Sequence, residues 1–252
     1  MIPSVQNLSQ ESDFRDLSPW LWLWLPLIYL LINIIAAGIG HEFYETYIDG
    51  GELGSIELSS VLVLLIATVL GIHSLTIIRS LGDVRLGAWI FLGTLGCLYF
   101  GGEEASWGQH IFNWESSEAW LSFNDQQETN LHNSEKWGAL LDQLPRNLLT
   151  LGILVGGIIA PLYRRYKNLH LNPTGINYWI WPTIVGLPAG IIAVSVSFPE
   201  KIYGSITGVR ELPYFDISAG ELKELYCGYF LMVYMWSFNL RMRQLKKGLA
   251  GK

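Results

Sequence analysis

The chain has 252 residues, of which 50% are hydrophobic and only 15% are charged, and its mean hydropathy is +0.30. Soluble domains carry about 25% charged residues, so this composition argues against a water-soluble domain and excludes a disordered chain. A formal net charge of −6 argues against a general nucleic-acid binder. The two cysteines, Cys97 and Cys227, lie in apolar runs, which predicts buried free thiols.

Six apolar segments follow one another along the chain, separated by charged loops. Each is long enough to cross a bilayer as a helix, which needs roughly 20 residues, and none shows the alternating pattern of a strand. We therefore expect an all-α fold, a polytopic membrane helical bundle that forms a single domain over 1–252. The expected spans are about 19–40, 60–78, 86–108, 146–163, 178–198 and 221–240.

The loop charges predict the orientation of the bundle. If the N-terminus is cytoplasmic, 11 of the 16 basic residues fall on the inner side, as the positive-inside rule requires. An even number of spans then returns the C-terminus to the cytoplasm. Of the 22 acidic residues, 18 fall on the outer side. We expect a multi-pass protein of the cell membrane, and specifically of a bacterial inner membrane.

The longest loop, 103–145, joins the third and fourth spans on the outer side. It contains eight carboxylates, two histidines and four tryptophans, with Lys136 as its only basic residue before Pro145. Loops of this length in compact proteins are either functional or disordered, and disordered segments are poor in aromatic residues. The sequence therefore predicts an ordered cap at the outer membrane face.

Two adjacent carboxylates, Glu103 and Glu104, open this loop after 17 residues without a charge. Carboxylates are unfavourable at the negative C-terminal end of a helix. Either the helix continues through Gln109 or His110, or the pair is compensated by a cation, by Arg146 or by protonation of one member. A solvated helix end is the alternative interpretation.

A second polar feature is the amide-rich stretch 124–133. Glu128 and His132 are neighbours there whether the chain is helical or extended. A carboxylate and an imidazole on one face suit Zn, Mn or Fe, or a general-base pair. The Glu-x-x-x-His spacing is common, and a loop that only satisfies its own backbone is the alternative.

Together these features define one candidate site at the outer face. The expected catalytic residues are Glu103, Glu104, Glu128 and His132. The expected metal ligands are Glu104, His110, Glu128 and His132. The expected substrate-binding residues are Ser106, Trp107, Gln109, Asn124, Gln126 and Asn130. Glu221 and Glu224 begin the sixth span on the same face and could complete a metal shell.

The run 102–109 (GEEASWGQ), followed about twenty residues later by 128–133 (ETNLHN), resembles a signature of bacterial multi-pass membrane proteins to which no activity is attached. The resemblance covers about a sixth of the chain. It implies that the two stretches belong to one unit, and it assigns no catalytic role.

Two classes of function remain open. The first is a membrane enzyme that acts on a lipid or lipid-linked substrate, with a divalent metal or an acid–base pair. The second is a non-catalytic subunit, a transporter-like protein or an assembly partner of another membrane protein. The spans contain few ionisable groups, which argues against an ion-coupled transporter. A nucleotide-driven pump is also disfavoured, because the chain lacks a phosphate-binding glycine loop.

Overall fold

A computed structural model describes residues 14–50, 54–115, 129, 143–209, 212 and 216–250. All the regular elements within these ranges are helical. The expected all-α architecture is therefore confirmed for the part of the chain that the structure describes. Cys97 and Cys227 are buried free thiols, as expected.

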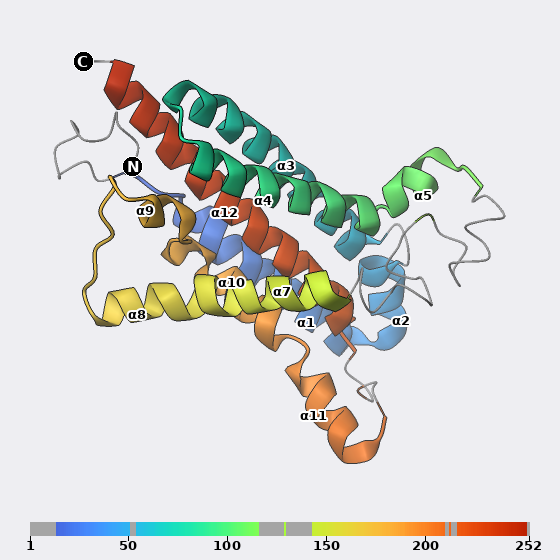
Figure 1. The fold of residues 1–252 in the computed structure, drawn as a ribbon. Coiled ribbons are helices and arrows are strands. Elements are labelled where there is room, and N and C mark those ends of the chain that lie inside the picture. Colours follow the sequence, from blue (N-terminus) through green and yellow to red (C-terminus); the bar gives the residue numbers. More distant parts are fainter. Residues whose placement is uncertain are drawn as a thin grey trace.

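The described helices run back and forth between two ends of an elongated bundle (Figure 1). The first pass joins η2 to α1, the second is α3 and the third is α4. The fourth joins α7, η7 and α8, the fifth runs from α9 through η8 and α10 to α11, and the last is α12. The bounds are η2 Trp20–Trp24, α1 Leu25–Ile39, α3 Ser55–Leu81, α4 Val84–Glu104, α7 Leu144–Gly152, η7 Ile153–Ile159, α8 Ala160–Tyr166, α9 Ile176–Ile180, η8 Ile184–Gly186, α10 Leu187–Ser195, α11 Phe198–Thr207 and α12 Ala219–Ala250.

Five of these passes are long and apolar enough to cross a membrane. They are Trp20–Ile39, Ser55–Leu81, Val84–Glu104, Leu144–Tyr166 and Ile176–Thr207. Their outward faces carry exposed Leu, Ile, Val and Phe side chains. Exposed apolar surface of this extent is what a lipid environment stabilises. The chain therefore has the architecture of a multi-pass membrane protein.

The last helix, α12, has a different character. It passes through the middle of the bundle, packed mainly on α3 and α10 (Figure 1). Its buried positions include Leu222, Val233, Phe238 and Met242, together with the polar Asn239. A helix covered by its neighbours needs less apolar composition than one that faces lipid, because protein rather than hydrocarbon surrounds it. For this reason α12 is not among the five passes recognised by composition, although the sequence predicts a sixth span at 221–240.

Close approach of helices depends on glycines in the fourth and fifth passes. An added Cβ at Gly157 would lie 2.4 Å from the Phe230 ring, and one at Gly186 would lie 2.8 Å from the same ring. The two glycines therefore form a recess for Phe230 of α12. Close packing through small residues is typical of membrane helices.

The bundle has two chemically distinct ends. At the first, the backbone N–H of Arg15 donates to Gln244 Oε1 (2.9 Å) and Gln244 Nε2 donates to the Arg15 carbonyl (2.8 Å). We call it the terminal end, because it joins the described N-terminal segment to the last turns of α12. The opposite end holds the end of α4, the start of α7 and the start of α12 (Figure 1), and we call it the carboxylate end.

Candidate functional site

The α4 helix stops at Glu104, before the expected boundary at 108. Ser106, Trp107 and Gly108 all have positive φ values (42°, 53° and 93°), which a continuous α-helix does not tolerate. The chain turns there through η5 (Ser106–Gly108) and enters α5 (Gln109–Phe112). Of the two alternatives for the acidic pair, helix continuation is therefore wrong. The carboxylates lie at a helix C-terminus and need compensation from elsewhere.

Each of the two carboxylates is buried and has its own surroundings. Glu103 is 4% exposed, and its Oε1 accepts a hydrogen bond of 2.7 Å from Trp107 Nε1. The turn at 106–108 folds the Trp107 ring back over Gly102, where an added Cβ would lie 2.8 Å from ring atoms. Glu104 is 6% exposed, so a solvated helix end is also wrong.

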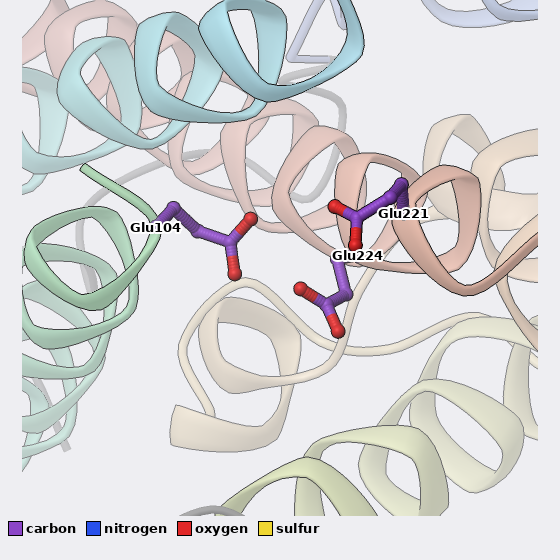
Figure 2. Close-up of side chains that lie close together, drawn as sticks. All are labelled: Glu104, Glu221 and Glu224. Atoms are coloured by element: carbon purple, nitrogen blue, oxygen red, sulfur yellow. The ribbon is translucent and has the colours of Figure 1, made fainter. Parts of the chain in front are cut away.

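Glu104 points across the bundle toward the first turns of α12 (Figure 2). Carboxylate oxygens of Glu104, Glu221 and Glu224 lie within 4.8 Å of one another. Glu221 and Glu224 are three residues apart and therefore share one face of α12. We call these three residues the carboxylate cluster. The structure thus joins the predicted Glu104 to the two glutamates that could complete a metal shell.

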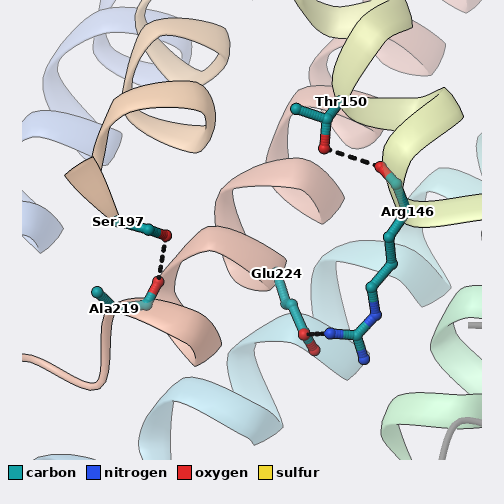
Figure 3. Close-up of polar contacts among 5 residues, drawn as sticks. All are labelled: Arg146, Thr150, Ser197, Ala219 and Glu224. Atoms are coloured by element: carbon teal, nitrogen blue, oxygen red, sulfur yellow. Dashed lines mark hydrogen bonds and ion pairs between the residues drawn. The ribbon is translucent and has the colours of Figure 1, made fainter. Parts of the chain in front are cut away.

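Arg146, near the start of α7, supplies a positive charge to the cluster. Its Nη1 pairs with Glu224 Oε1, and its backbone carbonyl accepts a 2.8 Å hydrogen bond from Thr150 Oγ1 (Figure 3). Arg146 was one of the three compensating groups expected for the acidic pair. It pairs with one of the three clustered carboxylates.

The start of α12 is fixed by several side chains of the carboxylate end. Ser218 Oγ donates to Asp49 Oδ2 (2.6 Å), and Ser197 Oγ donates to the Ala219 carbonyl (3.3 Å; Figure 3). Tyr44 donates from its hydroxyl to the Ile217 carbonyl at 2.7 Å. Burial and the nearby Asp49 raise the pKa of Tyr44, so its hydroxyl stays a protonated donor. These contacts position the two glutamates of α12.

An apolar cavity of about 280 Å³ adjoins the cluster. Glu103, Glu104 and Arg146 line its polar part, while Gly93, Leu149 and Leu231 line the part that lies deeper in the bundle. A second cavity of about 450 Å³ shares these three deeper residues and has an almost entirely apolar lining. The pair of cavities therefore leads from the carboxylates along α4 and α7 into the apolar part of the bundle.

The two stretches of the sequence signature meet in the structure. Gln109 Oε1 accepts a hydrogen bond of 2.7 Å from Thr129 Oγ1 and another from the Thr129 backbone N–H. Trp114 Nε1 also donates to Thr129 Oγ1, at 3.3 Å. Gln109 thus acts as an acceptor for Thr129, which is the one residue of 128–133 that the structure describes.

The other predicted site residues fall into two groups. Ser106 is buried in the turn after α4, and Trp107 donates a hydrogen bond to Glu103. His110 lies in α5, where the structure describes only its backbone. The remaining predictions lie outside the described residues: Asn124, Gln126, Glu128, Asn130 and His132.

Comparison of the chain with protein-family models, with curated proteins and with solved structures found no match. The class of the protein therefore follows from its fold and its site alone. It is a multi-pass helical membrane protein with a carboxylate cluster at one end of its bundle, in which Glu104 is buried, Glu224 half-buried and Glu221 exposed.

Proposed function

We propose that this protein is a membrane enzyme that binds a divalent cation at Glu104, Glu221 and Glu224 and acts on a lipid or lipid-linked substrate. The observation that carries the proposal is the carboxylate cluster, whose buried member Glu104 also lines the polar end of an apolar cavity. The expected Glu128 and His132 of the long outer loop would add ligands or an acid–base pair to the same site.

The charge balance of the cluster supports a cation. Three carboxylates within 4.8 Å repel one another, and burial of Glu104 increases the cost of its charge. Arg146 offsets one negative charge. Oxygen-only ligand sets suit hard divalent ions, so among Zn, Mn and Fe the described donors favour Mn²⁺. Such an ion polarises an ester or phosphoryl oxygen, or lowers the pKa of a bound water.

The cavities support an amphiphilic substrate. Pockets for small molecules are usually apolar with a few polar groups that orient the ligand. Here the polar groups are Glu103, Glu104 and Arg146, and the apolar part continues along α4 and α7 between helices that are suited to a membrane. A hydrocarbon chain fits the apolar part, and the head group would then lie at the carboxylates.

The direct test is metal analysis of the detergent-purified protein after exposure to Mn²⁺ and dialysis. We expect about one ion per chain in the wild type and a near-complete loss in the Glu104→Gln/Glu221→Gln variant. Glu42→Gln is the matched control, because Glu42 is an exposed carboxylate at the same end and outside the cluster. Equal metal content in all three proteins, or none in the wild type, would contradict the cation site.

Turnover is tested separately with membrane lipid extracts. The wild type should convert a lipid of the extract, seen by mass spectrometry, and the Glu104→Gln/Glu221→Gln variant should not, while both proteins remain folded and membrane-inserted. Conversion at equal rates would place the chemistry elsewhere. Metal binding without any conversion would leave a cation-binding protein that is not an enzyme.

A non-catalytic subunit is the second candidate, and one feature favours it. The α11 helix projects from the bundle at the carboxylate end (Figure 1). Phe198, Ile202 and Ile206 recur every four residues along one face of this helix and are all exposed. An apolar face of this kind suits a partner protein or the membrane interface. A stoichiometric membrane protein that co-purifies with the wild type and is lost on Ile202→Asp would favour this function.

A further inference from the structure

The terminal end of the bundle contains a cavity of a different chemical kind. Its volume is about 440 Å³, and α8, α9, α12 and the connections between them surround it. Four residues of its lining are basic or titrate to a positive charge: Arg164, Arg165, His170 and Arg241. No acidic residue is among the described residues that line it.

Arg241 is the most unusual member of this lining. Its side chain is 2% exposed, although it carries a permanent charge. Nη1 donates to the Tyr178 carbonyl (2.9 Å) and Nε to the Ser237 carbonyl (3.3 Å). The third nitrogen, Nη2, is buried and has no hydrogen-bond partner among the residues that the structure describes.

Aromatic rings hold the guanidinium in place but do not neutralise it. The guanidinium carbon of Arg241 lies 5.3 Å from the centre of the Tyr178 ring and 5.7 Å from that of Trp179. Cation–π contacts of this length are favourable, but they leave the N–H donors available. A buried arginine normally pairs with an anion, because a desolvated charge without one is costly.

Arg164, a half-buried member of the lining, also lacks an acidic partner among the residues that the structure describes. Its Nη2 donates to the Pro182 carbonyl at 2.5 Å. Within the described ranges, neither Arg164 nor Arg241 forms an ion pair with a carboxylate. Among the described residues, Asp16 is an acid that reaches this region, and its Oδ2 accepts a 2.6 Å hydrogen bond from Thr183 Oγ1, another residue of the lining.

We propose that this cavity binds a phosphate group, held by Arg241 and Arg164 from inside and by Arg165 and His170 at the mouth. Arginine donors match phosphate oxygens in geometry and charge, and Arg241, whose Nη2 has no hydrogen-bond partner among the described residues, is part of the lining. The phosphate could belong to a lipid head group or to a free phosphate ion. Basic pockets between membrane helices on the cytoplasmic side bind anionic head groups, and the terminal end is the expected cytoplasmic side. This site is independent of the carboxylate cluster.

The two sources are distinguished by two measurements on the detergent-purified full chain. In the first, native mass spectrometry follows the binding of dioleoyl phosphatidylglycerol and of dioleoyl phosphatidylcholine. In the second, thermal unfolding is followed in potassium phosphate and in potassium chloride of equal ionic strength. A head-group site binds phosphatidylglycerol in clear preference to phosphatidylcholine, whereas a site for free phosphate raises the unfolding midpoint in phosphate beyond that in chloride.

Three variants connect the binding to the cavity. Arg241→Gln and Arg164→Gln should each weaken binding of the phosphate-bearing probe about tenfold, the effect of losing one charge-assisted contact. Arg243→Gln is the matched control, since Arg243 is an exposed arginine two residues along α12 that does not line the cavity. If Arg241→Gln does not fold, Arg165→Gln replaces it, because Arg165 is exposed.

Two results would overturn the proposal. The first is a wild type that binds both lipids equally and gains nothing from phosphate over chloride. The second is a loss of binding in Arg243→Gln as large as that in Arg164→Gln, which would indicate attraction by the overall charge of this end.

Discussion

At the scale of residues, the protein separates its buried charges by sign. Glu103 and Glu104 are buried at the carboxylate end, and Arg241 is buried at the terminal end. A buried charge is retained in a helical bundle only when hydrogen bonds, an opposite charge or a ligand stabilise it. Arg146 does this for Glu224, one member of the carboxylate cluster.

The pairing of Arg146 with Glu224 leads to a prediction for stability. Arg146→Gln leaves three mutually repelling carboxylates, so we expect it to lower the free energy of unfolding by about 1–2 kcal/mol. This figure lies between the contributions of exposed and of buried ion pairs, because the Arg146 side chain is 35% exposed. Added Mn²⁺ should restore more stability to this variant than to the wild type. Thermal unfolding in detergent, with and without Mn²⁺, measures both effects.

The control for this prediction is the double variant Arg146→Gln/Glu224→Gln. It removes the charge that Arg146 neutralises and should be more stable than Arg146→Gln alone. If both variants unfold at the same temperature and Mn²⁺ acts equally on all proteins, the pair contributes nothing to the balance of charge in the cluster.

Much of the site could be predicted from the sequence, but not its assembly. Glu104 and Arg146 are predictable because a charge directly beside a long apolar segment stands out. Glu221 and Glu224 belong to the same cluster, but they lie more than a hundred residues beyond Glu104, and only the packing of α12 beside the end of α4 brings them together. No local pattern encodes that contact. Arg241 lies at the end of the last apolar run, and the sequence distinguishes it from the other basic residues of the inner side by no local pattern.

At the scale of elements, helix positions follow from apolar periodicity, while helix breaks depend on single backbone conformations. The end of α4 at Glu104 rests on positive φ values at Ser106 and Trp107, which side-chain identity does not dictate. The apolar run likewise predicts a sixth span at 221–240 but does not show that α12 occupies the centre of the bundle. That position becomes clear only from its burial by the other helices.

The recess around Phe230 gives a prediction at this scale. Gly157→Ala would place a methyl group 2.4 Å from the Phe230 ring, so η7 and α12 must separate and the unfolding midpoint should fall. Overpacking of this kind costs about 1–3 kcal/mol. Gly152→Ala is the matched control in the same helical pass, because an added Cβ there meets nothing within 4 Å. Equal midpoints for the two variants would mean that α12 is not held closely against the fourth pass.

At the scale of the whole molecule, the two ends of the bundle differ in the chemistry that they offer. The carboxylate end combines acidic side chains with an apolar cavity, and the terminal end combines arginines with a polar one. The excess of basic residues predicts that the terminal end faces the cytoplasm. The hydrogen bonds between Arg15 and Gln244 place the described N-terminal segment and the end of α12 at this same end.

The orientation can be measured with single cysteines. Tyr47→Cys places a thiol at an exposed position of the carboxylate end, in η3 (Glu45–Asp49), and Lys167→Cys places one at an exposed position after α8. A membrane-impermeant maleimide should label Tyr47→Cys in intact cells. It should label Lys167→Cys only after the cells are permeabilised. The native chain is the control, since Cys97 and Cys227 are buried. The opposite labelling pattern would invert the bundle and place the phosphate site outside. Labelling of both positions in intact cells would mean that no membrane separates the two ends.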